Sequence, residues 1–524
     1  MNRGKMKKLF AFLLLASLFM SFAGLQYARA DSTGGDTGTA SDLSPETDIT
    51  SPESLAGEVG HNKISINFIW VFLGAILVFF MQAGFAMVET GFCRRQNANH
   101  VMMTNFIVFA VGVVGFFAAG FALMFGGVGP LATLGGGDIL NARAQLAQGW
   151  SVVGLKGFFG SGGFYDTGVM MFFLFQLVFM DTAATIVTGA MAERWKFSAF
   201  LVYGFFMSAI LYPAYGHWVW GGGWLSQLGA NLGLGNGFVD FAGSSVVHAV
   251  GGICALAGAM VIGPRFGKYD SEGKARPMPG HNIPMAIVGV IILVFGWFGF
   301  NSASTLSGGD LRLSAVAVNT MLAAAAGCLA AMFFVWRRHG KPDPSMSANG
   351  MLAGLVAITA PCAFVAPWAA LVIGVTAGFI VCLGVELLDR LHIDDPVGAV
   401  AVHGMNGIFG VLAVGLFADG SYGAGLNGVE GAVRGLFYGN PGQLWAQLIG
   451  ALACATFVFG VSYAFFRLQD RIQGIRVPLE QEIEGLDVHE MGITAYGEGD
   501  GSFFESIGFK LEPEPLAVVE GRRA

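Results

Sequence analysis

Charged residues are scarce in this sequence. Asp, Glu, Lys and Arg make up only 12% of the 524 residues, while 54% are hydrophobic and 79 are Gly. A soluble chain of this length would form about three or four domains and carry charge on about a quarter of its residues. So few charges exclude that arrangement, because several soluble domains would lack a polar surface. We therefore predict a polytopic membrane protein with long apolar segments in contact with membrane lipid.

Cysteine motifs and basic patches are also lacking. The six cysteines show no CxxC or zinc-type spacing and lie almost entirely in apolar runs, which excludes a disulfide framework. The formal net charge is −7 and no basic patch stands out, so no nucleic-acid partner is expected. No nucleophile–base pair, metal cluster or phosphate-binding loop appears, and we expect neither enzyme activity nor a cofactor or metal.

The N-terminal residues 1–30 are organised as an export signal. Basic residues from Arg3 to Lys8 precede an apolar run, and Ala28-Arg29-Ala30 forms a small–x–small cleavage site. We predict a signal peptide that is removed after export; an uncleaved first anchor is the alternative. Residues 31–62 are rich in Ser, Thr, Gly and Asp and are predicted to form a flexible segment outside the membrane.

Residues 63–468 contain eleven apolar stretches long enough to cross a hydrocarbon core of about 30 Å. They cover approximately residues 64–90, 101–126, 167–192, 197–216, 240–263, 283–303, 312–336, 346–364, 367–389, 396–417 and 442–468. Lys and Arg concentrate in the connections on one side, such as Arg94, Arg194 and Arg337. This bias places the mature N-terminus outside a plasma (inner) membrane and the tail, residues 469–524, in the cytoplasm.

Two stretches of the chain, 240–253 and 395–408, repeat one pattern. In each, an Asp (Asp240 or Asp395) is followed eight residues later by a His (His248 or His403). The copies lie five spans apart and so run in opposite directions, as in the inverted repeats of many transporters. Each Asp can cap the first helical turn, which puts each His about 12 Å into the membrane. We therefore predict an all-α membrane fold with a five-plus-five inverted repeat and two imidazoles meeting near the midplane.

The paired histidines have two interpretations. Each imidazole could be a structural group bonded to a neighbouring helix, or the pair could line a conduction pathway, since ionisable groups in lipid are costly. Two His without Cys or carboxylate ligands make a poor metal site. A neutral imidazole offers one donor and one acceptor, so the pair suits a proton or a small hydrogen-bonding solute. We favour conduction.

Motifs along the chain resemble the ammonium transporter (Amt) family of the Amt/Rhesus superfamily. They are DFAGSSVVH at 240–248, GWFGFN at 296–301, DDPVGAVAVHG at 394–404, AER at 192–194, WGGG at 220–223 and the tail motif at 476–487. The resemblance extends from about residue 64 to 498. It implies an eleven-helix fold, a homotrimer, one narrow pore in each subunit, and ammonium or methylammonium as the substrate.

The resemblance also implies roles for individual residues. Ammonium is a small cation that only donates hydrogen bonds, so aromatic faces and one acceptor suit it. The implied outer site comprises Phe179, Trp220, Phe300 and Ser304. The implied gate and lining comprise Phe175, Phe179, Phe300, His248, His403, Ile186 and Leu293, with Phe85 as a further lining residue and Tyr212 at the outer rim. Ammonium would lose its proton below the Phe gate, and ammonia would pass the histidines into the cytoplasm.

Several charged positions need separate interpretations. Asp240 is either a cation ligand or a helix cap, and we favour the cap, as for Asp395. Glu193 is predicted to pair with Arg194 at the inner end of the third span. Asp181, in the middle of that span, departs from the family pattern and is interpreted as structural. A second departure is Gly398, at a position that is acidic in some members.

The tail and two rival functions complete the expectations. In the family, the segment corresponding to 476–487 packs beneath the trimer and helps PII-type signalling proteins to block the pore, so such a partner is expected here; a solvated tail is the alternative. A Rhesus-type channel for neutral ammonia or carbon dioxide is one rival, although a neutral gas needs no cation site. An ammonium sensor that signals through the tail is the other.

Overall fold

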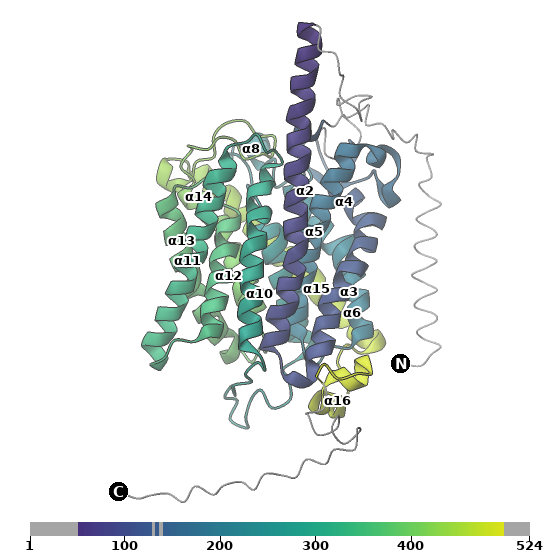
Figure 1. Cartoon of the computed structure of the whole chain (residues 1–524), viewed down its shortest axis with the longest axis vertical. Coiled ribbons are helices and arrows are strands. Elements are labelled where there is room, and N and C mark those ends of the chain that lie inside the picture. The colour runs from purple at the N-terminus through teal and green to yellow at the C-terminus, as the bar shows by residue number, and fades with distance from the viewer. Residues whose placement is uncertain (1–50, 128–130, 136–139, 497–524) are drawn as a thin grey trace, which may run out of the picture.

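The computed structural model describes residues 51–127, 131–135 and 140–496, which form a bundle of long helices (Figure 1). The predicted signal peptide, residues 31–50 and the end of the tail lie outside the described residues. The long helices are α2 (Pro52–Phe92), α3 (Ala98–Gly115), α5 (Thr167–Met191), α6 (Phe197–Phe206), α9 (Val250–Ile262), α10 (Ile283–Trp297), α11 (Arg312–His339), α12 (Pro344–Thr359), α13 (Pro367–Arg390), α14 (Asn406–Phe417) and α15 (Pro441–Gln473).

Shorter elements extend or connect these helices. The short α-helices are α4 (Phe121–Phe125), α7 (Tyr212–Val219), α8 (Leu228–Leu232) and α16 (Leu479–Glu484). The π-helical turns are η3 (Phe116–Gly120), η7 (Met207–Leu211), η8 (Ser244–Ala249), η9 (Phe298–Ser302), η11 (Val400–Met405) and η13 (Asp487–Met491). The 3₁₀ turns are η2 (Arg95–Asn97), η4 (Ala132–Leu134), η5 (Phe158–Gly160), η6 (Gly162–Tyr165), η10 (Ala303–Thr305) and η12 (Leu436–Tyr438), and β1 (Arg143–Gln145) pairs antiparallel with β2 (Ser151–Gly154).

Ten helical segments among the described residues are long and apolar enough to cross a membrane. They correspond to ten of the eleven predicted spans, and several combine an α-helix with a π-turn, as in Ser244–Ile262, where the π-turn precedes the α-helix. The eleventh, predicted at 346–364, is α12, whose 16 residues rise about 24 Å. This helix packs against α11 and α13 inside the bundle. The chain is a multi-pass, all-α membrane protein.

The first helix begins earlier than the sequence predicted. Residues 31–62 were expected to be flexible, but α2 starts at Pro52 and projects beyond the bundle (Figure 1). Ser51 caps it: its hydroxyl accepts a hydrogen bond from the Ser54 N–H at 3.1 Å. Elongating a helix that already exists costs far less than nucleating one, so this polar segment continues the membrane helix despite Gly57 and Gly60.

The two copies of the repeated motif start their helices in the same way. The Asp240 carboxylate accepts hydrogen bonds from the N–H groups of Gly243, Ser245 and Val246. The Asp395 carboxylate accepts them from the N–H groups of Gly398 and Val400, at 3.0 and 2.7 Å. Gly243 and Gly398 both have positive φ, 111° and 81°, which only Gly adopts without strain. A π-turn follows in each copy.

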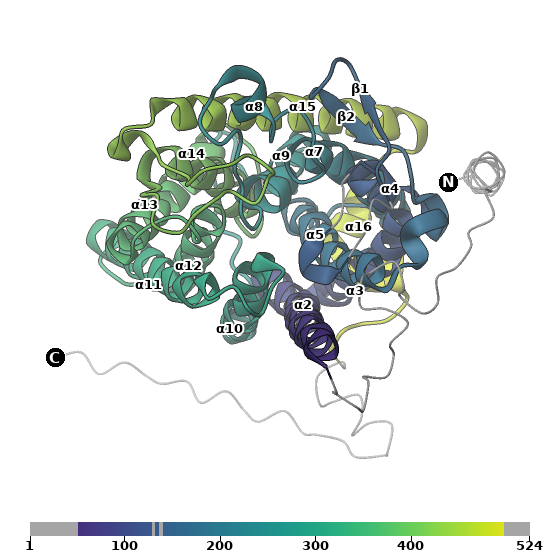
Figure 2. The same ribbon diagram turned by 90° about the horizontal axis from the view of Figure 1, so that it is seen from above.

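The two copies cross where their backbones approach closely. The start of each helix lies against the other copy's helix, η8 against α14 and η11 against α9. A Cβ atom placed on Gly252 would lie 2.1 Å from the Gly404 backbone nitrogen, and one on Gly407 would lie 2.4 Å from the Ser244 carbonyl oxygen. Viewed from above, these helices lie among the others, while α15 runs along one edge (Figure 2). The close crossing fixes the spacing of the two histidines.

Buried ion pairs join the helix ends on the side that the sequence predicts to be cytoplasmic, called inner below, with the opposite side called outer, and they correct one prediction. Glu193 does not pair with Arg194: it binds the guanidinium and backbone N–H of Arg94 and lies 3.3 Å from Arg265. The reason is local, because Glu193 follows the end of α5 with a left-handed backbone (φ 71°) that turns its side chain away from Arg194. Arg194 instead donates hydrogen bonds to the carbonyl oxygens of Ala192, Gly263 and Asp394.

Asp394 completes this network. Its carboxylate accepts both a backbone and two guanidinium hydrogen bonds from Arg265, at 2.8–2.9 Å. Burial alone would disfavour the charged form, but the guanidinium groups of Arg194 and Arg265 outweigh it and hold the pKa of Asp394 well below its usual range. The inner ends of α5, α9 and α13 are thus fastened by fully buried charges.

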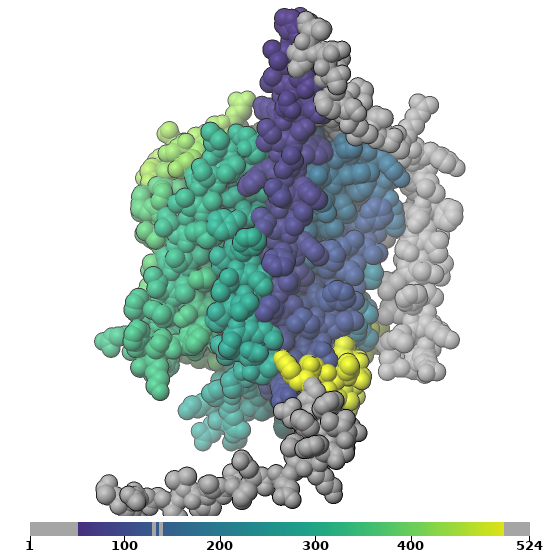
Figure 3. Space-filling view, viewed as in Figure 1, coloured from purple at the N-terminus to yellow at the C-terminus, as the bar shows by residue number. Residues whose placement is uncertain are grey.

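The described part of the tail packs on the inner ends of the helices. Arg476 binds Glu482 through two hydrogen bonds of 2.9 Å. Further along, the Leu486 N–H donates to Asn97, and the His100 N–H donates to the Asp487 carboxylate. Figure 3 shows this yellow segment against the lower end of the blue helices. These contacts are incompatible with a freely solvated tail up to residue 491.

Candidate functional site

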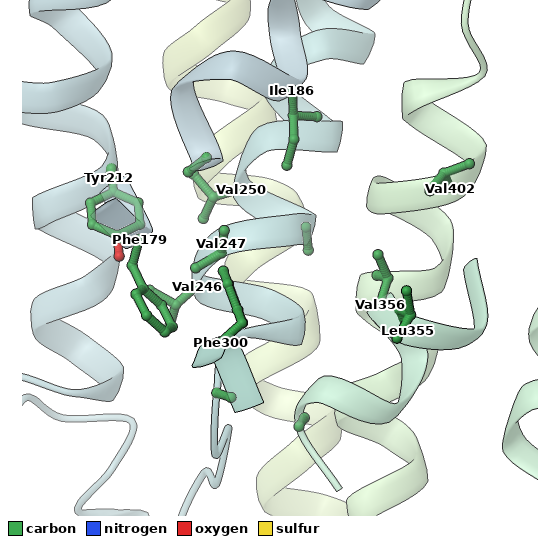
Figure 4. Close-up of a cluster of buried hydrophobic side chains, with 14 of the residues drawn as sticks. Phe179, Ile186, Tyr212, Val246, Val247, Val250, Phe300, Leu355, Val356 and Val402 are labelled. Carbon is green, nitrogen blue, oxygen red and sulfur yellow. The ribbon is translucent and has the colours of Figure 1, made fainter. Parts of the chain in front are cut away.

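Two stacked phenylalanines lie between the outer side of the protein and the two histidines. Phe179 of α5 and Phe300 of η9 have ring centroids 4.1 Å apart and ring planes 25° apart. Figure 4 shows the two rings side by side, with Val246 and Val247 beside them. Both side chains are at most 1% exposed. The stack leaves no room for a hydrated ion between them, because π-stacked rings are already in van der Waals contact.

An open cavity of about 410 Å³ lies outside this stack. Phe175, Phe179, Trp220, Asp240 and Ser304 are among the residues that line it. The Trp220 ring meets Phe179 edge-on at 6.1 Å, and its indole N–H donates to the Asp240 carbonyl oxygen at 2.7 Å. The structure thus places three of the predicted outer-site residues, Phe179, Trp220 and Ser304, on the cavity wall, and the fourth, Phe300, stacks against Phe179 without lining the cavity. Aromatic faces gathered around one hydroxyl can hold a small cation.

The hydroxyl of Ser304 and the carboxylate of Asp240 differ in what they offer this cavity. Ser304 donates its proton to the Phe300 carbonyl oxygen at 2.7 Å, which leaves its oxygen lone pairs as acceptors. Asp240 also accepts the Ser245 hydroxyl at 2.7 Å, in addition to its three backbone bonds. Its oxygens are therefore occupied in holding the start of η8, the geometry of a helix cap.

The two histidines meet on the inner side of the Phe stack. His248 of η8 and His403 of η11 place their Nδ1 atoms 3.2 Å apart, within hydrogen-bond distance. One face of the His248 ring lies against Phe300 and Trp297, with centroid distances of 5.4 and 5.2 Å. His248 is fully buried and His403 is 5% exposed. A hydrogen bond between two imidazoles requires that one donates while the other accepts, so a proton can pass between them.

A small inner cavity of about 20 Å³ lies beyond His403. Phe85, Glu89, Ile186 and His403 are among its lining residues. The order along the path is therefore outer cavity, Phe179, Phe300, His248, His403 and inner cavity. The polar lining residues of the inner cavity are Glu89, Asn349 and His403, and its other lining residues are apolar.

Two of the predicted residues, Tyr212 and Leu293, line neither cavity, and Asp181, interpreted as structural, is also buried away from both. Tyr212 is fully buried beside Phe116 and lines neither cavity, so it does not form the outer rim. Leu293 packs against Gly84 of α2 and also lines neither cavity. Asp181 is buried, and its Oδ1 atom has no hydrogen-bond partner among the described residues.

Sequence reasoning missed two residues of this path. Trp297 precedes the Phe300 turn, stacks on His248 and donates its indole N–H to Thr359. Glu89 lines the inner cavity. The signal for Glu89 was available, because it is the only charged residue between Ile64 and Thr90, and an acid in a membrane span is costly.

Two capped helices of opposite direction bring two imidazoles together between an outer and an inner cavity. This arrangement defines a membrane transporter or channel for a small solute. A family model described as the Ammonium Transporter Family matches residues 69–496 of this chain. The chain belongs to that family.

Individual relatives agree with this assignment. The chain is 50% identical over 437 residues to ammonium transporter Amt2 of Archaeoglobus fulgidus, with 83% of this chain and 89% of the relative covered. It is 38% identical over 448 residues to ammonium transporter Amt1 of Haloferax mediterranei, with 83% and 80% covered. These relatives are named as transporters and not as enzymes.

Solved structures share the fold. A structure named Sensor Amt Protein matches with a TM-score of 0.71 and 35% identity, covering 82% of this chain and 99% of that one. The crystal structure of Candida albicans Mep2 matches with a TM-score of 0.65 and 28% identity, covering 80% and 87%.

Proposed function

We propose that this protein takes up ammonium by capturing it at the outer aromatic site, removing its proton and conducting ammonia past His248 and His403 into the cytoplasm. The observation that supports this most directly is the sequence of groups along one path: an aromatic cavity, a stacked Phe pair, and two imidazoles 3.2 Å apart. The cavity suits a cation, whereas the narrow apolar path beyond it suits a neutral molecule.

Each part of the path contributes a separate discrimination in this proposal. Phe179 and Trp220 attract the cation through their ring faces, a cation–π attraction worth about 0.5–2 kcal/mol per contact. Potassium would gain the same attraction, but it cannot donate hydrogen bonds to Ser304 or to an imidazole. Ammonia, formed when ammonium loses its proton, is neutral, so it enters the apolar path at a lower electrostatic cost than an ion does. It can also form hydrogen bonds with the His pair.

We infer the arrangement in the cell from the sequence and from the family. We propose that the protein lies in the plasma membrane with its mature N-terminus outside and its C-terminus inside, as the distribution of Lys and Arg favours. A homotrimer with one pore in each subunit is proposed from the family. The ordered tail between Arg476 and Met491 would present a docking surface for a PII-type regulatory protein at the cytoplasmic side.

Uptake of labelled methylammonium by cells that lack their own ammonium transporters tests the function. We expect saturable uptake that excess ammonium inhibits, and none with the empty vector. Absence of uptake by folded, membrane-inserted protein would refute the transporter proposal. An ammonium sensor remains the alternative, and it predicts signalling through the tail without appreciable flux.

Replacing Trp220 tests the outer site. Trp220→Leu removes the ring beside Phe179 and the indole N–H bonded to Asp240. We expect the concentration for half-maximal uptake to rise about 2- to 30-fold, the equivalent of about 0.5–2 kcal/mol of cation–π attraction. The preference for ammonium over potassium should fall as well. Unchanged affinity and selectivity would instead favour a Rhesus-type channel for a neutral gas, which needs no cation site.

A further inference from the structure

The inner cavity contains an acid that the path described so far does not use. Glu89 lies near the inner end of α2 and is 3% exposed. It lines the same cavity of about 20 Å³ as His403. A space of that size holds a single water molecule, provided that polar groups surround it, and here Glu89, His403 and Asn349 supply them.

The hydrogen bonds around Glu89 come from two other helices. Asn105 of α3 donates its amide N–H to the Glu89 carboxyl at 2.8 Å. The Thr188 hydroxyl of α5 lies 2.9 and 2.8 Å from the two carboxyl oxygens. A chain of donors continues behind Asn105, because Thr185 donates to the Asn105 side-chain oxygen and Gln82 donates to Thr185. Glu89 is thus the end point of a polar network that reaches the cavity.

The hydrogen bonds around Glu89 are compatible with a protonated carboxyl group. A hydroxyl carries one proton, and the Thr188 hydroxyl also donates to the Thr185 carbonyl oxygen. Its contacts with Glu89 are then satisfied when the carboxyl group itself carries a proton and donates it to the Thr188 oxygen. Among the described residues Glu89 takes part in no ion pair, whereas the equally buried Glu193 pairs with two arginines. An unpaired carboxylate would be costly in this position.

We propose that Glu89 is the inner proton relay of the pore: it passes to the cytoplasmic side the proton that ammonium gives up and that the His pair carries. The protonated carboxyl gives its proton to water on the inner side, which breaks its O–H bond and leaves a carboxylate. A water in the inner cavity then gives a proton to the carboxylate and takes one from the imidazolium of His403. This restores a neutral carboxyl, a neutral imidazole and the water, so that one proton enters and one leaves.

The relay rests on the proposed function and extends it. It assigns the proton and ammonia to one path beyond the Phe gate, so that each transported ammonia is accompanied by a charge. Of the other acids at this end, Glu193 and Asp394 are paired with arginines. The oxygens of Asp395 hold the N–H groups of Gly398 and Val400, and Asp395 does not line the inner cavity. Glu89 is therefore the acid placed to receive a proton from His403.

Purified protein in liposomes tests the relay through two measurements: the current that an ammonium pulse produces, and the change in internal pH. Glu89→Gln keeps the size and hydrogen-bonding shape but cannot release a proton. We expect its current to fall by about a hundredfold or more, as for loss of a general acid–base group. Ammonia entry should continue and make the interior alkaline, whereas the wild type carries current with less alkalinisation.

Controls separate this role from a structural one. Gln82→Leu removes the far end of the network without touching the cavity and should keep the wild-type current. If Glu89→Gln fails to fold, Glu89→Met combined with Asn105→Leu removes both partners of the bond and should show the same loss of current. Wild-type current in either folded Glu89 variant would overturn the relay, as would loss of both current and ammonia entry. If liposomes that contain the wild-type protein show neither current nor ammonia entry, the proposed function itself is refuted. If they show ammonia entry but no current, only the relay is refuted.

Discussion

A single methyl group at Gly252 should separate the two histidines. Gly252 lies one helical turn beyond His248, and Gly404 follows His403 directly. A Cβ atom at position 252 would lie 2.1 Å from the Gly404 nitrogen and 2.5 Å from its Cα. Both are backbone atoms, so no side-chain rotation can relieve the overlap.

The size of the required movement follows from these distances. An ordinary Cβ contact begins at about 3.4 Å, so the backbones must separate by about 1.3 Å in Gly252→Ala. The Nδ1–Nδ1 distance of 3.2 Å would then approach about 4.5 Å, beyond the range of a hydrogen bond. We expect uptake to fall about a hundredfold, as for a misplacement of about 1 Å in a reacting pair. Overpacking should also destabilise the protein by about 1–3 kcal/mol.

Uptake of labelled methylammonium, measured beside thermal unfolding of the purified protein, checks both parts. Gly460→Ala is the matched control, because a Cβ atom there meets nothing within 4 Å. It should leave uptake unchanged and be neutral or stabilising by up to about 1 kcal/mol. Wild-type uptake by folded Gly252→Ala protein would refute the reasoning, since it would show that the histidines need not touch.

Two further predictions concern the inner ion-pair network. Arg265→Met leaves Glu193 and Asp394 without their shared partner and should destabilise the protein by about 3–5 kcal/mol in thermal unfolding, whereas Arg390→Met, at an exposed pair, should be nearly neutral. Because the folded-state pKa of Asp394 lies below the value of about 3.9 in an unfolded chain, its contribution to stability is complete above that pH and is lost as the pH falls further. The free energy of unfolding, measured from pH 7 down to pH 3, should therefore fall as the pH is lowered, and it should fall less in Arg265→Met. Equal decreases in the two proteins would contradict the assignment of this pH dependence to the Asp394–Arg265 pair.

Periodicity and repetition made the overall path predictable from sequence. Apolar stretches gave the spans, and the matching Asp and His of the two copies indicated that His248 and His403 would meet, as their 3.2 Å contact shows. The outer aromatic residues came from family motifs instead, because nothing in composition separates Phe179 from the other 46 Phe residues. The motifs picked out Phe175, Phe179, Trp220 and Ser304, which line one cavity in the structure.

Other features depend on contacts that sequence spacing does not encode. Glu193 precedes Arg194 in the chain, yet a left-handed turn at the helix end directs it to Arg94 and Arg265, which are distant in sequence. Tyr212 shared the aromatic character of the outer site but is held inside the bundle. The π-turns that contain both histidines lie where the two helices cross, and they were not predicted from the sequence.

The pseudo-symmetry of the repeat makes the effect of a methyl group position-specific. Gly252 and Gly407 are equivalent in the two copies, and each packs against the residue that follows the opposite histidine, Gly404 or Ala249. The residue after His248 is thus already an alanine, so this position tolerates a Cβ atom.

Accordingly, a Cβ atom on Gly404 would come only to 3.2 Å from the Gly252 carbonyl carbon, which a shift of about 0.2 Å relieves. Gly404→Ala should therefore retain most of the uptake, while Gly407→Ala, with a contact of 2.4 Å, should lose it as Gly252→Ala does. Equal losses at positions 404 and 407 would mean that general flexibility of the helices, and not their distance of approach, sets the flux.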